Sequence, residues 1–98
     1  MKAWELISDP TKWTQGLYAS DADGNQTKIK DGVCFCVDGA ILRVYGFQEN
    51  DGMRLAIWKE WKKRFGTNPI DDNDSPGMTA EIMSARLKEV EEAVLSES

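Results

Sequence analysis

Histidine is absent from the 98 residues of this chain, and cysteine occurs only twice. Without histidine the chain lacks the commonest general base of enzymes, every Ser-His or Cys-His dyad and most kinds of zinc site. No apolar stretch approaches the roughly 20 residues that a membrane-spanning helix needs, and "MKAWELISDP" at the start has no apolar run of the signal-peptide type. We therefore expect a cytoplasmic protein that binds no membrane and keeps its thiols reduced.

Charge is unevenly distributed along the chain. The net charge is −5, yet residues 51–66 carry five basic and two acidic residues, whereas residues 67–98 carry two basic and eight acidic ones. An acidic chain is a poor candidate for general nucleic-acid binding. The length is that of one domain, so we expect residues 1–98 to form a single domain.

The two cysteines, Cys34 and Cys36, lie inside the apolar stretch "GVCFCVDGAI". Their spacing differs from the C-x-x-C of redox motifs, and two cysteines supply at most half of a structural zinc site. On a helix the side chains would point about 200° apart, whereas on a strand they would share a face. We expect Cys36 to be buried, reduced and unpaired with Cys34, because its close neighbours include no cation that would lower a thiol pKa. A reactive Cys36 is the alternative.

Two acidic segments are candidates for a metal site. "DADGNQ" begins like a calcium loop, but its sixth and twelfth positions are Gln26 and Gly32, where such a loop needs a glycine and an acidic residue. "DDNDSPG", residues 71–77, has the composition to bind a hard cation weakly, although a solvated loop before the next helix explains it better. We expect no metal and no cofactor.

Hydrophobic periodicity predicts three helices, over residues 2–8, 51–65 and 79–95. The first ends before Pro10, since the residue preceding proline avoids the helical region. The third begins at Thr79, a suitable N-cap. The side chains that we expect the second helix to bury are Ile57, Trp58, Trp61 and Phe65.

The remaining segments carry strand and turn signals. Residues 13–29 have strand-favouring side chains on both sides of "DADGN" and predict a short, irregular β-hairpin. Residues 67–77 predict a loop. Residues 33–47 are apolar nearly throughout, which fits a buried central helix, but Asp38 and Gly39 form a strong two-residue hairpin signal. Local physics leaves both structures open for this segment.

Three stretches, "KWTQGLYASDADGN", "VCFCVDGAI" and "IDDNDSPGMTAEIM", together resemble one family. It comprises small proteins of bacteria and their phages, catalogued as a domain of unknown function, with W-T-Q-G, W-C-x-x-G-A and W-N-D motifs. Phe35 and Asp72 stand where the family tends to have tryptophan in the last two motifs. The resemblance covers most of residues 13–90, and it implies a helix in residues 33–47 and no established activity.

We therefore expect a mainly α fold, a small α+β arrangement of three to four helices with a short irregular β-hairpin. The missing histidine favours a small cytoplasmic binding or regulatory protein, phage-linked, that acts through contacts with another protein or with a second copy, and not an enzyme. The alternative is a small-ligand binder or enzyme. Its pocket would be lined by Trp13, Gln15, Tyr18, Cys36, Asn73 and Asp74.

Overall fold

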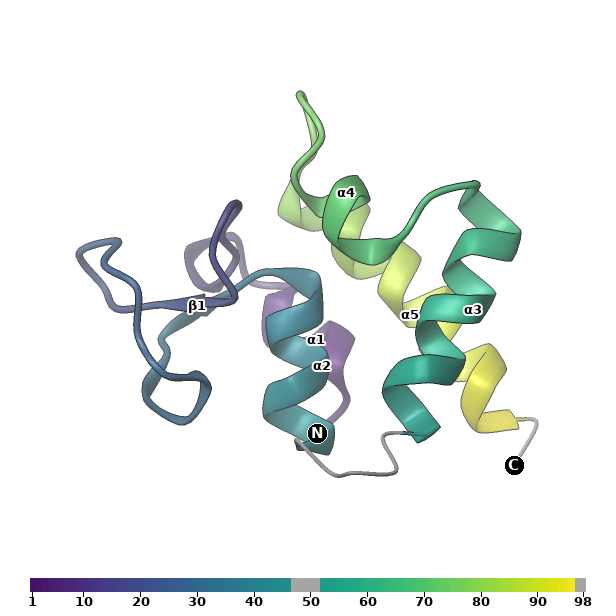
Figure 1. The fold of residues 1–98 in the computed structure, drawn as a ribbon. Helices are drawn as coiled ribbons and strands as arrows, with labels where there is room; N and C mark the ends of the chain where they lie inside the picture. The colour runs from purple at the N-terminus through teal and green to yellow at the C-terminus, as the bar shows by residue number, and fades with distance from the viewer. Residues whose placement is uncertain (47–51, 97–98) are drawn as a thin grey trace.

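The computed structural model describes residues 1–46 and 52–96, and most of them lie in helices (Figure 1). The three longer helices are α2 (Val37–Tyr45), α3 (Gly52–Phe65) and α5 (Ala80–Ser96). Two helices of five residues are α1 (Ala3–Ile7) and α4 (Pro69–Asn73). The remaining elements are strands β1 (Ala19–Ser20) and β2 (Cys34–Phe35) and the 3-10 turns η1 (Pro10–Lys12) and η2 (Ile29–Asp31). The expected mainly α fold with a small antiparallel hairpin is confirmed.

The core lies where α5 packs against α1 and α3 while α2 packs against α1. The segment that contains β1 extends on the side of α2 away from α3 and α5 (Figure 1). The largest apolar side chains that are fully buried are Ile7, Ile41, Ile57, Trp61, Met83 and Leu87. These residues come from α1, α2, α3 and α5. The core is therefore complete only when α1 packs against α5, which lies at the other end of the sequence.

Helix α3 matches the predicted helix, except that residue 51 lies outside the described residues. Ile57 and Trp61 are fully buried as expected. Trp58 and Phe65 are only half-buried, so the expectation that both are buried is wrong. Trp58 lies at the margin of the core because its indole N–H donates a hydrogen bond to Asp38 on α2 at 2.9 Å.

The segment that local physics left open, residues 33–47, contains a strand and then a helix. Residue 47 lies outside the described residues. Asp38 and Gly39 lie in the first turn of α2 and form no hairpin turn. Strand β1 pairs with β2, through Ala19 with Phe35 and Ser20 with Cys34. The helix that the family resemblance implied therefore covers only the second part of the segment.

The hairpin prediction for residues 13–29 is right in its turn and wrong in its strands. The amide of Asp21 donates to the carbonyl of Asn25 at 2.9 Å, and Gly24 has φ +87°, as a turn requires. Beyond this turn the chain pairs with β1 only briefly: Gln26 forms an isolated antiparallel bridge with Ser20, and the amide of Thr27 donates to the carbonyl of Ala19 at 3.2 Å. This pairing does not grow into a strand, because Ile29 begins η2. The second strand of the hairpin comes instead from β2.

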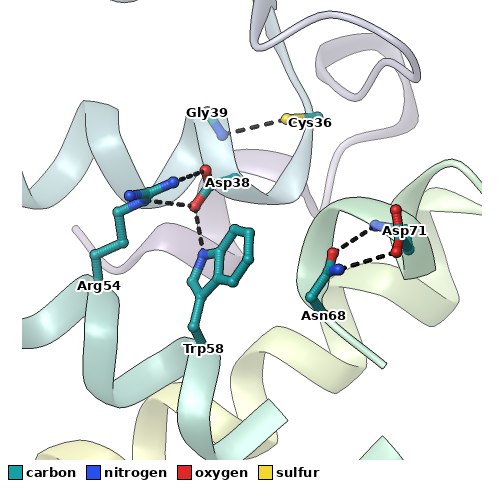
Figure 2. Close-up of polar contacts among 7 residues, drawn as sticks. All are labelled: Cys36, Asp38, Gly39, Arg54, Trp58, Asn68 and Asp71. Carbon is teal, nitrogen blue, oxygen red and sulfur yellow. Dashed lines mark hydrogen bonds and ion pairs between the residues drawn. The ribbon is translucent and has the colours of Figure 1, made fainter. Parts of the chain in front are cut away.

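The expectation that residues 67–77 form a loop is wrong over residues 69–73, where α4 lies. Asn68 is the N-cap: its side chain accepts a hydrogen bond from the amide of Asp71 at 2.8 Å and donates one to that carboxylate at 2.9 Å (Figure 2). Pro69 takes the first helical position, where a missing N–H needs no partner. An Asn-Pro pair, although typical of turns, here begins a helix.

Asp38 joins α2 to α3. Its carboxylate is fully buried and accepts hydrogen bonds from Nε and Nη2 of Arg54, at 3.0 and 2.7 Å, and from the indole of Trp58 (Figure 2). A buried carboxylate without such donors would be destabilising by several kcal/mol. This forked ion pair therefore fixes how the two helices are placed.

Glu91 joins α5 to the start of the chain. Its fully buried carboxylate accepts hydrogen bonds from the amides of Ala3 at 2.9 Å and Trp4 at 3.1 Å, and from the hydroxyl of Tyr45. The first amides of a helix have no partner inside it, so a carboxylate from another helix can stabilise them. One side chain of α5 thus holds α1 and the last turn of α2.

Candidate functional site

Asn73, at the end of α4, is the residue around which the predicted site is built. Its side chain is fully buried, and its Oδ1 accepts hydrogen bonds from the indole Nε1 of Trp13 at 2.7 Å and from the amide of Val37 at 3.0 Å. Its Nδ2 donates to the carbonyl of Thr14 and to Oδ1 of Asp74, each at 3.1 Å. All four hydrogen-bonding positions of the amide are used within the protein.

Gln15 and Asp74 continue this network toward the surface. Nε2 of Gln15 donates to the carbonyls of Asn73 at 2.9 Å and Ser75 at 3.3 Å. Oδ1 of Asp74 accepts a second hydrogen bond from the amide of Gly16 at 2.9 Å. The structure thus brings together four of the six predicted site residues, and the two segments that meet here are about 60 residues apart in sequence.

Cys36 is the N-cap of α2, and its Sγ accepts a hydrogen bond from the amide of Gly39 at 3.3 Å (Figure 2). Its side chain is buried, and neither it nor Cys34 forms a disulfide. Burial raises the pKa of the Cys36 thiol to about 11, and the carboxylates of Asp38 and Asp74 add to the shift while the amides of the helix start oppose it. The thiol is therefore protonated at neutral pH, which weakens it as a nucleophile.

Gly39 lies directly against the backbone of Tyr18. A Cβ atom at this position would come within 1.8 Å of the Tyr18 carbonyl oxygen. The same oxygen accepts a hydrogen bond from the amide of Cys36 at 3.3 Å. The Cys and Gly of the C-x-x-G-A motif thus have structural roles: the cysteine caps α2, and the glycine lets α2 approach residue 18.

A shallow hollow lies beside this network, with a volume of about 80 Å³. We call it the Tyr18 hollow, and its walls are Gly16, Leu17, Tyr18, Cys36, Ile70 and Asp74. Three predicted site residues therefore line it, while Trp13, Gln15 and Asn73 are not among its walls. Oδ2 of Asp74 has no hydrogen-bond partner among the residues described. The volume is far below that of a typical site for a small-molecule ligand.

Sequence reasoning missed Leu17, Gly39 and Ile70 as parts of this site. Gly39 carried a usable signal, since a glycine early in a helix is unfavourable unless a close approach requires it. Leu17 and Ile70 carried none, because an apolar side chain in a turn-rich segment does not reveal which surface it will line.

Neither a metal cluster nor a membrane-spanning helix is present in residues 1–46 and 52–96. No cluster of three or more cysteine, aspartate or glutamate side chains there is placed to bind a metal ion. Within the same residues no helix combines the length and the apolar character needed to cross a membrane.

Raising the pH from 9 to 11 is expected to lower the free energy of unfolding by about 2 kcal/mol through Cys36 alone. The unfolded thiol loses its proton near pH 9, whereas the native thiol keeps it to about pH 11. The unfolded state therefore binds fewer protons in this range, and the stability that is present below pH 9 is lost as the pH rises. Urea unfolding at a series of pH values measures the loss.

The matched control is Cys36→Ala, which should remove this component of the pH dependence, whereas Cys34→Ala should keep it. Burial, followed by the hydrogen bond to Glu91, also raises the pKa of Tyr45 from its ordinary value of 10.0, so this group too lowers the stability as the pH rises above that value. The difference in the pH dependence of the free energy of unfolding between the native chain and Cys36→Ala therefore isolates the contribution of the thiol. Identical pH profiles for the native chain and Cys36→Ala would contradict the assignment.

Comparison with known proteins identifies a family for this chain. The model of a "Family of unknown function (DUF6197)" matches residues 1–93. No curated protein and no solved structure matches the chain. The family match includes every residue of the Asn73 network and of the Tyr18 hollow. The resemblance to an uncharacterised domain family is thus confirmed, and the chain belongs to the family of unknown function DUF6197.

Proposed function

We propose that this chain is a small binding protein that acts through contact with another protein at the Tyr18 hollow. The observation that carries the proposal is the side chain of Tyr18, which is 46% exposed beside a hollow with fixed walls. Tyrosine is among the residues that contribute most to the free energy of protein association. A single exposed aromatic is unremarkable, but here it stands next to a hollow that could receive a side chain.

The backbone that presents Tyr18 is held from two sides. Its carbonyl accepts a hydrogen bond from the amide of Cys36, and the next residue, Ala19, is paired in β1. Across the hollow, Asp74 is held by the amide of Gly16 and by the side chain of Asn73. A surface that is already ordered loses less conformational entropy on binding, which favours recognition of a partner.

The size and the charge of the hollow indicate its occupant. A volume of about 80 Å³ admits one short side chain rather than a nucleotide or a coenzyme. Leu17 and Ile70 supply apolar walls, and the free oxygen of Asp74 can accept a hydrogen bond. The partner would therefore offer a short donor-bearing side chain, set in an apolar surface that covers Tyr18.

The alternative, a small-ligand binder or enzyme at the same residues, has less support. The polar side-chain atoms of Trp13 and Asn73 are bound within the protein, and the thiol of Cys36 is protonated at neutral pH. A cytoplasmic, phage-linked setting remains part of the proposal. The free thiols of Cys34 and Cys36 are compatible with a reducing compartment.

Photo-crosslinking tests the proposal. The full chain carries benzoylphenylalanine in place of Tyr18 and is irradiated inside the cell that encodes it. The control carries the same group at Lys62, which lies exposed on α3. We expect a protein adduct from position 18 that position 62 does not give.

Tyr18→Ala then tests the contact with the purified partner. The variant should weaken the partner's affinity at least tenfold, as loss of an interface aromatic does, while the free energy of unfolding changes by less than about 0.5 kcal/mol. Lys62→Ala should leave the affinity unchanged. Equal adducts from both positions, or unchanged affinity of Tyr18→Ala, would overturn the proposal. A small molecule that co-purifies and is displaced by Tyr18→Ala would favour the alternative.

A further inference from the structure

A second and larger depression lies where α1 meets the segment before α2 and the last turns of α2. Its volume is about 510 Å³, within the range of small-molecule sites. We call it the α1–α2 groove, and its walls differ from those of the Tyr18 hollow. The walls used below are Leu6, Lys12, Val33, Phe35, Arg43 and Val44.

The groove is positively charged in a protein whose net charge is −5. Lys12 and Arg43 line it, and among residues 1–46 and 52–96 no carboxylate does. Both cations are exposed, and neither forms a hydrogen bond or ion pair with residues 1–46 or 52–96. Asp9, the acidic residue nearest to Lys12 in sequence, is bound through Oδ1 to the amide and hydroxyl of Thr11 and makes no ion pair with Lys12, although these hydrogen bonds and then the charge of Lys12 lower the pKa of Asp9. Two cations beside one concave surface raise the local concentration of anions.

Apolar side chains make up the rest of the surface. Phe35 is buried at 3% exposure, whereas Val33 is 47% exposed, and Leu6 and Val44 are half-buried. The wall is held in place because β2 contains Phe35 and the amide of Val33 donates to the carbonyl of Ser20 at 2.8 Å. The groove therefore combines exposed apolar area with two cations that form no ion pair among the described residues, which suits a ligand that has both an apolar body and an anionic end.

We propose that the α1–α2 groove binds a free amphipathic carboxylate such as a medium-chain fatty acid. The hydrocarbon chain lies on Leu6, Val33 and Val44, and the carboxylate lies between or beside Lys12 and Arg43. Burying the chain supplies the free energy of association, and the charge selects the acid over its neutral analogues. This inference does not depend on the Tyr18 hollow, since the two surfaces differ in their walls.

Titration of the full chain with decanoate, kept below its micellar concentration, tests the inference. Calorimetry should show one saturable site, and 1-decanol should bind at least about tenfold more weakly, because a charged hydrogen bond contributes about that factor. In methyl NMR spectra the signals of Leu6, Val33 and Val44 should shift on titration. The methyl signals of Leu87 and Val90, buried elsewhere in the core, should not.

Charge reversal supplies the matched control. Arg43→Glu, or Lys12→Glu, should lower the affinity for decanoate at least about tenfold, and Lys62→Glu, the same change on exposed α3, should leave it within twofold. If Arg43→Glu lowers the thermal midpoint, Arg43→Gln tests the same point without adding a charge. Absence of saturable binding, equal binding of acid and alcohol, or insensitivity to both reversals would overturn the inference. Binding to phosphatidylglycerol vesicles without binding of free decanoate would also overturn it, because a lipid surface would then be the ligand.

Discussion

Asn73→Ala is expected to lower the free energy of unfolding by about 3–6 kcal/mol. The substitution removes the acceptor of the Trp13 indole and of the Val37 amide, and the donor to the Thr14 carbonyl. Each polar group that stays buried without a partner costs about 1–3 kcal/mol. The variant leaves three groups without their partner, and the expected loss lies in the lower part of their summed range because only the Val37 amide is buried, whereas the Trp13 indole and the Thr14 carbonyl are part-buried. Urea unfolding followed by tryptophan fluorescence measures the loss.

A local readout distinguishes this cause from general damage to the core. In Asn73→Ala the indole N–H of Trp13 should exchange with solvent much faster, because its hydrogen bond to Oδ1 is gone. The indole N–H of Trp61, which donates to Asp72 at 3.0 Å, should exchange more slowly than that of Trp13. Gln26→Ala, which truncates an exposed amide, should change stability by less than about 0.5 kcal/mol. A loss below about 1 kcal/mol for Asn73→Ala would show that water replaces the lost bonds.

Gly39→Ala is expected to lower the free energy of unfolding by about 3 kcal/mol or more. Two effects oppose each other here. Alanine in place of glycine inside a helix favours folding by about 0.5–1 kcal/mol. The new Cβ atom, however, would lie 1.8 Å from the carbonyl oxygen of Tyr18, which is backbone and cannot rotate away. Either α2 or residue 18 has to move, and this cost exceeds the gain in helix propensity.

Gly52→Ala is the matched control, because Gly52 also lies in a helix and a Cβ there meets nothing within 4 Å among the described residues. This variant should keep the native stability or raise it slightly. Thermal unfolding of the two variants side by side gives the comparison. Equal thermal midpoints would mean that the backbone at residue 18 moves aside without a cost in stability. The close approach to Tyr18 would then not explain the glycine at position 39.

The parts of the fold that could be predicted are those in which local and tertiary requirements agree. Apolar spacing predicted α3 and α5, and the hydroxyl of Thr79 does cap α5 by accepting from the amide of Ile82 at 3.2 Å. Residues 33–47 could not be decided locally, since a fully apolar segment fits a strand as well as a helix. Helix α4 was missed because Asn68 and Pro69 serve equally as a turn and as a helix start.

The site was predictable as a set of residues but not as an arrangement. Trp13, Cys36 and Asn73 drew attention through the family motifs, yet no sequence pattern states that the Asn73 amide is fully bound within the protein. That follows from contacts between segments about 60 residues apart, which only the folded chain creates. The α1–α2 groove escaped prediction for the same reason: Leu6, Val33 and Val44 come from three separate segments.

The hydrogen bonds from Ala3 and Trp4 to Glu91 also bear on when the fold can form during synthesis. Helix α1 leaves the ribosome before α5, because the carboxylate that holds its amides lies 88 positions after Ala3. Five residues are too few to remain helical in water without outside support. Residues 3–7 must therefore wait, not yet helical and open to proteases and chaperones, until Glu91 on α5 has emerged.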